Sequence, residues 1–196
     1  MLFELALKFI FLIGFIVISP ILIISIVLIF LEDGMPVLFV QKRLGRHENV
    51  FSIFKLRTMK NDTPDKGTHE IDKNHYLNFG SVLRKIKVDE LPQILNFLKG
   101  DINLIGPRPG LPSQSDLRHH RSIHNVFDIK PGITGLSQVL GYDMSDPETL
   151  AKVDKIYIER KSIRLDIMIF VATFFKPLRK RIAILLAKEL KQINHV

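Results

Sequence analysis

The sequence predicts an α+β protein that is mainly helical, with a membrane helix at its N-terminus, a small β-hairpin, short helices and C-terminal amphipathic helices. Three observations support this prediction: an uncharged apolar run over residues 9–31, an extended pattern over 37–57, and helix start and stop signals through much of the remainder. A chain of 196 residues is long enough for one domain with appendages. The net charge is +8 and cysteine is absent, which excludes a disulfide-stapled fold, a zinc–cysteine site and a cysteine nucleophile.

The apolar run contains 23 residues without a charge. A helix that crosses a bilayer needs about 20 such residues. A signal peptide has a shorter apolar core, of about 7–15 residues, followed by a cleavage site of small residues, and residues 31–36 do not match one. Cations follow the run closely, among them Lys42, Arg43 and Arg46. This pattern predicts that the body of the protein is cytoplasmic.

Ser19 and Pro20 lie in the middle of the run. Because proline lacks an N–H and clashes with the carbonyl four residues earlier, a kink or break is expected at residues 16–19. Two arrangements are consistent with this: a kinked helix that crosses the membrane, and a helix–break–helix that enters one leaflet and returns. Length by itself favours the crossing helix.

Residues 37–57 predict a β-hairpin, because β-prone residues flank a possible turn at residues 44–46. Side chains alternate along a strand, so Lys55 and Arg57 share one face. Two cations on one face indicate either a solvated strand edge or a two-pronged contact for an anion.

Residues 60–75 are polar, contain Pro and Gly and show no periodicity, so we expect a mobile loop that could cover a site. A helix is predicted over 79–87. A second helix should follow, since Asp89 has N-cap character, Pro92 suits a first turn and Gly100 suits a C-terminal stop.

Proline-rich stretches interrupt the second half of the chain. Residues 106–109 predict a rigid extended loop, and residues 131–135 predict a rigid turn. Ser145 to Glu148 resembles a capping box with serine at the N-cap, and its helix should run to about Lys161.

The tail combines an apolar segment, residues 163–175, with a basic amphipathic pattern after Pro177. Such a pattern is typical of a helix that lies on a membrane surface, and the alternative is a core or dimer helix. The expected organisation is a membrane anchor over 1–33, a cytoplasmic catalytic domain over 34–162 and an interfacial tail over 163–196.

Three groups of residues are candidates for chemistry. Asp89 and Glu90 point about 100° apart on a helix, so they can divide roles between substrate and metal; the alternative is simple capping. Arg108 is held between two prolines, and its planar guanidinium suits a phosphate; the alternative is a polyproline turn with a surface arginine. His120 and His124 have the spacing of metal ligands, but without a third ligand nearby they indicate a solvated basic face.

The common nucleotide-binding and hydrolase motifs are absent from the sequence. Several blocks nevertheless occur in a specific order: Ser19-Pro20, Gln41-Lys42-Arg43-Leu44-Gly45, Phe54-Lys55-Leu56-Arg57-Thr58-Met59, Asp89-Glu90-Leu91-Pro92-Gln93, Gly106-Pro107-Arg108-Pro109 and Pro131-Gly132-Ile133-Thr134-Gly135. In these blocks the chain resembles the bacterial sugar transferase family, the small monotopic phosphoglycosyl transferases, over about residues 5–175.

The resemblance implies transfer of a sugar 1-phosphate from a UDP-sugar to polyprenyl (undecaprenyl) phosphate, with release of UMP, as the first membrane step of surface glycan synthesis. It implies Asp89 as the nucleophile and Glu90 as the ligand of a Mg²⁺ cofactor. Arg108 and Arg84 would serve the phosphates. Lys55 is implied as a further cation of the site, and the same block supplies Arg57 as a candidate phosphate ligand.

The resemblance also bears on topology and substrate. With Ser19 and Pro20 at the centre of the run, it implies a re-entrant helix in the cytoplasmic membrane, with Leu2 and Gly34 both on the cytoplasmic side. Residues 138–142 depart from the Q-V-N-G-R pattern of many members, which leaves the sugar open. Residues 143–148 are similar to those of members that act on deoxy acetamido sugars. Lipid length and oligomeric state are equally open.

Two other functions are less consistent with the sequence. A membrane-anchored basic module for nucleic acid or acidic lipid is supported by the net charge alone, and the aromatic residues are mostly phenylalanines in apolar runs with no stacking platform among the cations. We therefore expect no nucleic-acid partner. An inactive scaffold for glycan assembly would not need the intact Asp89, Glu90 and Arg108.

Overall fold

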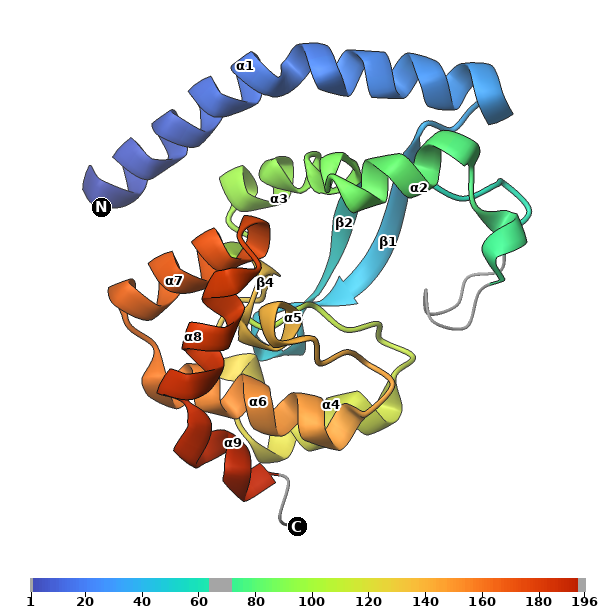
Figure 1. Ribbon diagram of the computed structural model, residues 1–196. Helices are drawn as coiled ribbons and strands as arrows, with labels where there is room; N and C mark the ends of the chain where they lie inside the picture. The colour runs from blue at the N-terminus through green and yellow to red at the C-terminus, as the bar shows by residue number, and fades with distance from the viewer. Residues whose placement is uncertain (1, 64–71, 194–196) are drawn as a thin grey trace. The chain divides into compact units, whose positions relative to one another are not determined.

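A computed structural model describes residues 2–63 and 72–193. The chain is mainly helical with two small sheets, as the sequence predicts (Figure 1). It forms two compact units, which are described separately: the first comprises Met1–Gln41 and Ser52–Lys99, and the second comprises Lys42–Phe51 and Gly100–Val196. These units are defined by packing. The functional division into anchor, catalytic domain and tail stays a prediction.

The first unit begins with α1 (Leu2–Asp33), one continuous helix that curves along its length in Figure 1. Pro20 lacks the N–H that would bond the carbonyl of Ile16, and the Ser19 hydroxyl donates to that carbonyl at 2.7 Å. The freed acceptor is thus satisfied within the helix, as an apolar environment requires. The expected kink is accommodated by a bend, and no break between two helices is seen.

Within the described residues, α1 carries the one stretch long and apolar enough to cross a membrane, Ile16–Asp33. One face of this stretch packs on the first unit's core, and Ile29 is completely buried there. The core cluster contains Ile29, Leu56, Leu77, Leu83 and Val88, with Leu22 and Ile26 partly buried against it. The apolar helix and the rest of the first unit therefore share one core.

The hairpin is confirmed as β1 (Leu38–Leu44) and β2 (Val50–Leu56), joined by a 3₁₀ turn η1 (Arg46–Glu48). The first unit continues with η3 (Lys73–His75), α2 (Asn78–Lys85), η4 (Val88–Glu90) and α3 (Gln93–Lys99). Gly100 ends α3 with φ +83°, as its position predicts. Residues 64–71 of the predicted loop lie outside the described residues.

The second unit contains short parallel strands β3 (Asn103–Ile105) and β4 (Gly132–Thr134). Around them lie α4 (Ser115–Ile123), η5 (Val126–Asp128), α5 (Leu136–Leu140), α6 (Pro147–Arg160), α7 (Ile163–Phe174), α8 (Pro177–Leu185) and α9 (Ala187–Ile193). Strand β4 corrects the prediction of a simple turn at 131–135. Residue preferences for strands could not predict β4, because a segment of three residues forms a strand only when it pairs with another strand.

Glycines at the ends of β3 and β4 let the two backbones interlock. A Cβ on Gly132 would lie 2.1 Å from the backbone nitrogen of Gly106, and one on Gly135 would lie 2.1 Å from the carbonyl oxygen of Gly106. Gly106 donates to the carbonyl of Thr134 at 3.0 Å, and Gly132 donates to that of Pro107 at 2.9 Å. The two glycine- and proline-containing blocks are therefore parts of one backbone junction.

Helix α6 begins one residue later than the predicted capping box. Asp146 is the N-cap, and its carboxylate accepts from the backbone N–H of Thr149 at 3.1 Å. Ser145 instead bonds Asp143. The helix ends at Arg160, close to the predicted end.

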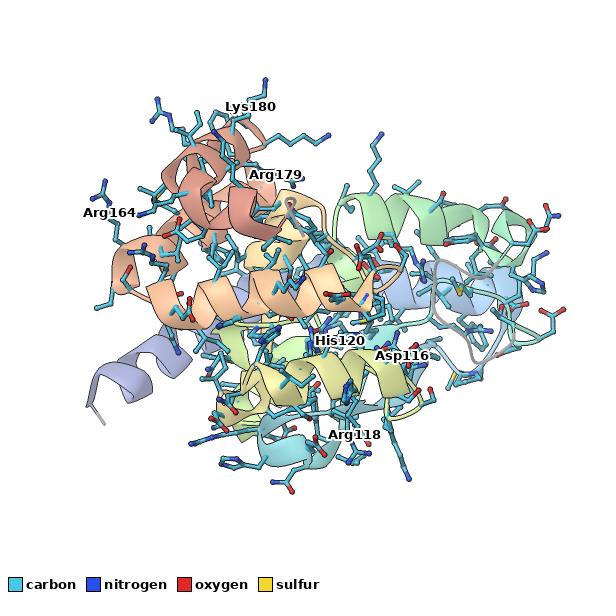
Figure 2. The ribbon with its side chains drawn as sticks, turned by 90° about the horizontal axis from the view of Figure 1, so that it is seen from below. Asp116, Arg118, His120, Arg164, Arg179 and Lys180 are labelled. Carbon is cyan, nitrogen blue, oxygen red and sulfur yellow. The ribbon has the colours of Figure 1, made fainter. Side chains whose placement is uncertain are left out.

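The tail divides its apolar residues between core and surface. Ile182 and Leu186 are buried in the second unit's core, which is the packing that the alternative core-helix interpretation predicts for them. The exposed large apolar side chains are Ile163, Ile167, Phe170, Val171, Phe174, Phe175, Ile184 and Leu185. Figure 2 shows Arg164 and Lys180 extending outward from α7 and α8. Attachment of this surface to a membrane stays a prediction.

The close packing of Gly106, Gly132 and Gly135, here called the glycine junction, predicts that one added methyl group strongly lowers the stability of the protein. Gly132→Ala should destabilise the protein by about 3 kcal/mol or more, because the added Cβ meets backbone atoms that have no other rotamer to adopt. Gly14→Ala is the control, since a Cβ there meets no atom within 4 Å. Thermal unfolding in detergent measures both variants, and equal midpoints would contradict the interlocked junction.

Candidate active site

Asp89 lies in the short turn η4, between α2 and α3 of the first unit. Lys87, two residues before Asp89 and at the N-cap of that turn, has φ 61°, a left-handed conformation that is unusual outside glycine. This bend starts the turn and leaves the Asp89 side chain only 7% exposed. Among the described residues, the Asp89 carboxylate forms no ion pair. Strained backbone next to a buried carboxylate is typical of a functional site.

Glu90 forms an ion pair with Lys55 of β2, with 2.9 Å between Oε1 and Nζ, and both side chains are 15% exposed. The strand that carries Lys55 is fastened to α3 by Asn96, which is fully buried. Asn96 accepts from the backbone N–H of Phe54 at 3.1 Å and donates to the carbonyl of Ser52 at 2.7 Å. These two hydrogen bonds hold β2 against α3, and they thereby fix the position of Lys55 relative to the Asp89–Glu90 pair.

Arg84 projects from the last turn of α2 and is held by two neighbours. Its Nε donates to the Thr58 hydroxyl at 2.7 Å and its Nη1 donates to the Tyr76 hydroxyl at 3.2 Å. The guanidinium also lies over the Tyr76 ring, 4.7 Å from its centroid. Arg84 is thus oriented before any substrate binds.

The electrostatics of the site act on Asp89 in opposite directions. Burial raises the pKa of its carboxyl group and the charge of Glu90 raises it further, whereas the cations of Lys55 and Arg84 lower it. The structure therefore brings together four of the residues singled out from the sequence: Asp89, Glu90, Lys55 and Arg84.

Arg57 has a different environment. Its side chain is buried and forms an ion pair with Asp33 at the end of α1. Its Nη2 also donates to the carbonyls of Asp33 and Gly34, at 3.1 and 2.7 Å. In the described structure Arg57 fastens the end of α1, and a role in phosphate binding stays a prediction.

Arg108 belongs to the second unit, in the extended segment between β3 and α4. Three successive carbonyls of this segment accept hydrogen bonds: Arg108 from Arg121 at 2.8 Å, Pro109 from Arg43 at 3.2 Å, and Gly110 from the Leu44 backbone at 2.9 Å. The predicted rigid loop is therefore confirmed.

A buried ion pair contacts the backbone of the Arg108 segment through Arg121. Arg121 bonds Asp154 through Nε and Nη2 at 3.0 and 2.7 Å, and Ser137 donates to the same carboxylate at 2.9 Å. All three side chains are at most 2% exposed. The backbone position of Arg108 thus depends on a charge network that the sequence analysis did not identify.

The carboxylates of the site bear on metal binding. Among the described residues, no group of three His, Asp or Glu side chains could hold one. Mg²⁺ is usually held by one or two carboxylates together with substrate phosphates, so Glu90 fits a magnesium ion that is bound mainly by the substrate. The pairing of Glu90 with Lys55 shows that its carboxylate already balances a cation.

Sequence reasoning missed several residues that support the site: Asn96, Tyr76, Thr58 and the Arg121–Asp154 pair. Asn96 lies seven residues after Asp89, inside a helix where asparagine is unfavourable. This mismatch between residue type and helical position could have identified Asn96 from the sequence. The others carry no local signal, because their partners lie more than seven residues away.

Comparison with known proteins identifies the family of the chain. The family model described as "Bacterial sugar transferase" matches residues 2–180. The uncharacterised sugar transferase EpsL of Bacillus subtilis is 35% identical over 178 residues, covering 91% of this chain and 84% of EpsL.

Two further relatives are longer. A UDP-N-acetylgalactosamine-undecaprenyl-phosphate N-acetylgalactosaminephosphotransferase of Aeromonas hydrophila is 35% identical over 171 residues, which cover 79% of this chain but 38% of that protein. A UDP-glucose:undecaprenyl-phosphate glucose-1-phosphate transferase of Caulobacter vibrioides is 34% identical over 166 residues, which cover 79% of this chain and 61% of that protein. The chain thus spans less than two thirds of either one. Together with the family match over residues 2–180, these similarities show that this transferase belongs to the bacterial sugar transferase family.

Proposed function

We propose that this protein transfers a sugar 1-phosphate from a UDP-sugar to undecaprenyl phosphate or a similar polyprenyl phosphate, and releases UMP. The observation that carries the proposal is the arrangement of the first unit. A buried carboxylate, Asp89, lies beside a carboxylate–lysine pair and an oriented arginine, in the same folded unit as an apolar membrane helix. The relatives named for undecaprenyl phosphate support the lipid acceptor.

In the first half-reaction, a carboxylate oxygen of Asp89 attacks the sugar-bearing phosphorus of the UDP-sugar. A bond forms between that oxygen and phosphorus, the phosphoanhydride bond breaks, and UMP leaves with the electron pair. Burial favours this step, because a carboxylate with few water contacts and a raised pKa is a stronger nucleophile. Lys55 and Arg84 supply positive charge against the growing charge of the leaving phosphate.

In the second half-reaction, a phosphate oxygen of the polyprenyl phosphate attacks the same phosphorus. The bond to Asp89 breaks and the carboxylate is regenerated. Splitting the transfer in this way means that the soluble donor and the lipid acceptor need not occupy the site together.

Mg²⁺, when bound, supplies Lewis-acid charge neutralisation at the diphosphate. We assign Glu90 as its protein ligand, which implies that Lys55 shifts from Glu90 toward the substrate when donor and metal bind. Arg108, on a backbone whose carbonyls are all held, is proposed as a further phosphate ligand. Arg57 is proposed to act mainly by fixing the end of α1.

We also propose that α1 enters the cytoplasmic leaflet and returns, so that both of its ends face the cytoplasm. The position of Ser19 and Pro20 in the middle of the apolar run and the cations that follow the helix support this arrangement. The acceptor phosphate lies at the same membrane surface, which accounts for an anchor that shares a core with the site.

The covalent route predicts an adduct on Asp89. Incubation with a reactive UDP-sugar and no lipid acceptor should release a burst of UMP and leave a sugar-phosphate mass on the peptide that contains Asp89. Asp89→Asn should lower turnover on the order of 10³-fold or more, because the amide is not a nucleophile. Near-normal turnover of Asp89→Asn, or UMP release only when lipid is present, would replace this route by direct transfer.

Asp89→Asn also predicts a gain in stability. A raised folded-state pKa means that the folded protein holds the proton more tightly than the unfolded chain, so stability falls as pH rises through that range and stays reduced at neutral pH. The variant should therefore unfold at a higher temperature than the parent at pH 7. The difference should vanish below the ordinary carboxyl pKa of 3.8.

Glu90→Gln is the matched control for this measurement. It deprives Lys55 of its ion-pair partner, so its unfolding temperature should fall at neutral pH. A lower unfolding temperature for both variants would show that Asp89 stabilises the fold, contrary to the electrostatic account.

The topology can be read by labelling, because the chain has no native cysteine. Single cysteines introduced as Leu2→Cys and Gly34→Cys should both resist a membrane-impermeant thiol reagent in intact cells and react after lysis. Labelling of Leu2→Cys from outside intact cells would show that α1 crosses the membrane.

A further inference from the structure

Helix α2 has no cap of its own at its N-terminus. It contains eight residues and begins after Leu77, whose side chain makes no capping hydrogen bond. The first N–H groups of a helix have no partner within the helix, and Ser, Thr, Asp or Asn usually supplies one from the position that Leu77 occupies. Because a helix this short is marginal by itself, its first turn needs a partner from elsewhere in the protein.

Glu32, in the last turn of α1, supplies that partner. Its Oε1 accepts from the backbone N–H of Asn78 at 2.5 Å, and its Oε2 accepts from that of Phe79 at 3.3 Å. Both carboxylate oxygens therefore face the start of α2, where a negative charge also interacts favourably with the helix dipole. Figure 1 shows α1 running alongside α2. The helix is thus capped by a residue 46 positions earlier in the chain.

The opposite end of α2 carries Arg84, in its last turn. The partners of its guanidinium, Thr58 and Tyr76, belong to segments that pair with each other outside the helix, through the bridge between Met59 and Tyr76. The helical residues from Asn78 to Arg84 span about 9 Å, whereas the same stretch unwound reaches roughly 20 Å. Loss of helical structure in α2 would therefore move Arg84 away from its partners, and the cap opposes that loss.

The neighbouring residue Asp33 makes a similar connection to β2. It forms an ion pair with Arg57, which directly follows β2 and shares that segment of chain with Lys55. The last two residues of α1 thus contact both segments that carry the cations near Asp89: Asp33 contacts the segment with Lys55, and Glu32 contacts the helix with Arg84.

We infer that Glu32 is a positioning residue for the proposed reaction: it caps α2 from α1 and thereby keeps Arg84 in place for the leaving phosphate. This inference rests on the proposed function, in which Arg84 offsets the charge of that phosphate. Glu32 itself touches neither the substrate nor the reacting atoms in this scheme. Because the side chain acts through the helix, its effect on the reaction should disappear when Arg84 is absent.

Hydrogen exchange of the full-length protein in nanodiscs tests the cap directly. In Glu32→Ala, the amides of residues 78–85 should exchange about five- to tenfold faster, because the helix loses a capping acceptor. Glu32→Gln keeps one acceptor oxygen and should lie between the parent and Glu32→Ala. Glu159→Ala is the matched control, since it removes the same charge from an exposed residue of α6 that pairs with Lys155, and it should leave exchange in α2 unchanged. Unchanged exchange in Glu32→Ala would overturn the inference.

A double-mutant cycle tests whether the cap acts on the reaction through Arg84. Glu32→Ala should lower kcat about five- to tenfold in the parent, but less than about twofold in the Arg84→Ala background. If Arg84→Ala is too slow to measure, Arg84→Lys takes its place, because lysine lacks the guanidinium fork that Thr58 and Tyr76 hold. Two results count against the inference: an equal loss in both backgrounds, which indicates a general effect on folding, and an unchanged kcat of Glu32→Ala.

The two measurements separate this inference from the proposed function. If the parent protein releases UMP and its kcat is insensitive to Glu32→Ala, the proposed function stands and the positioning role alone fails. If the parent releases no UMP with any donor, the proposed function fails and the positioning role fails with it, even where hydrogen exchange detects the cap.

Discussion

The burial of Ile29 against Leu83 and Val88 is the contact on which the first unit depends. It joins the apolar helix α1 to the two residues that directly precede Arg84 and Asp89 in the chain. Helix α1 is therefore part of the core that supports the site, and its removal would expose that core. In the proposed function the same helix also attaches the protein to the membrane, so one apolar helix would serve both the core and the attachment.

The site is built by fixing cations before the substrate arrives. Lys55 is held through the backbone bonds of Asn96, and Arg84 is held by Thr58 and the ring of Tyr76. Groups that are already oriented need little reorganisation when charge develops, which makes their electrostatic effect larger. Burial of the Asp89 carboxylate lowers the stability of the folded protein, and the charges of Lys55 and Arg84 offset part of this destabilisation.

The second unit positions a loop, the Arg108 segment, that has no secondary structure of its own. The glycine junction fixes where the Arg108 segment begins, and hydrogen bonds to three successive carbonyls fix its course. The buried Arg121–Asp154 pair contributes one of these bonds, and breaking such a pair leaves an uncompensated charge. Rigid backbone here comes from tertiary contacts and glycine packing.

The sequence by itself determined the features whose causes are local. The apolar run, the hairpin, the rigid loop at Arg108, the stop at Gly100 and the candidate pair Asp89–Glu90 all follow from periodicity, proline, glycine and charge over a few residues. The tertiary structure decided what depends on distant partners: strand β4, the attachment of Arg57 to α1, the burial of Ile182, and the support of Lys55 by Asn96. A local pattern states which face of an element is apolar, but only packing decides whether that face meets protein or remains exposed for another partner.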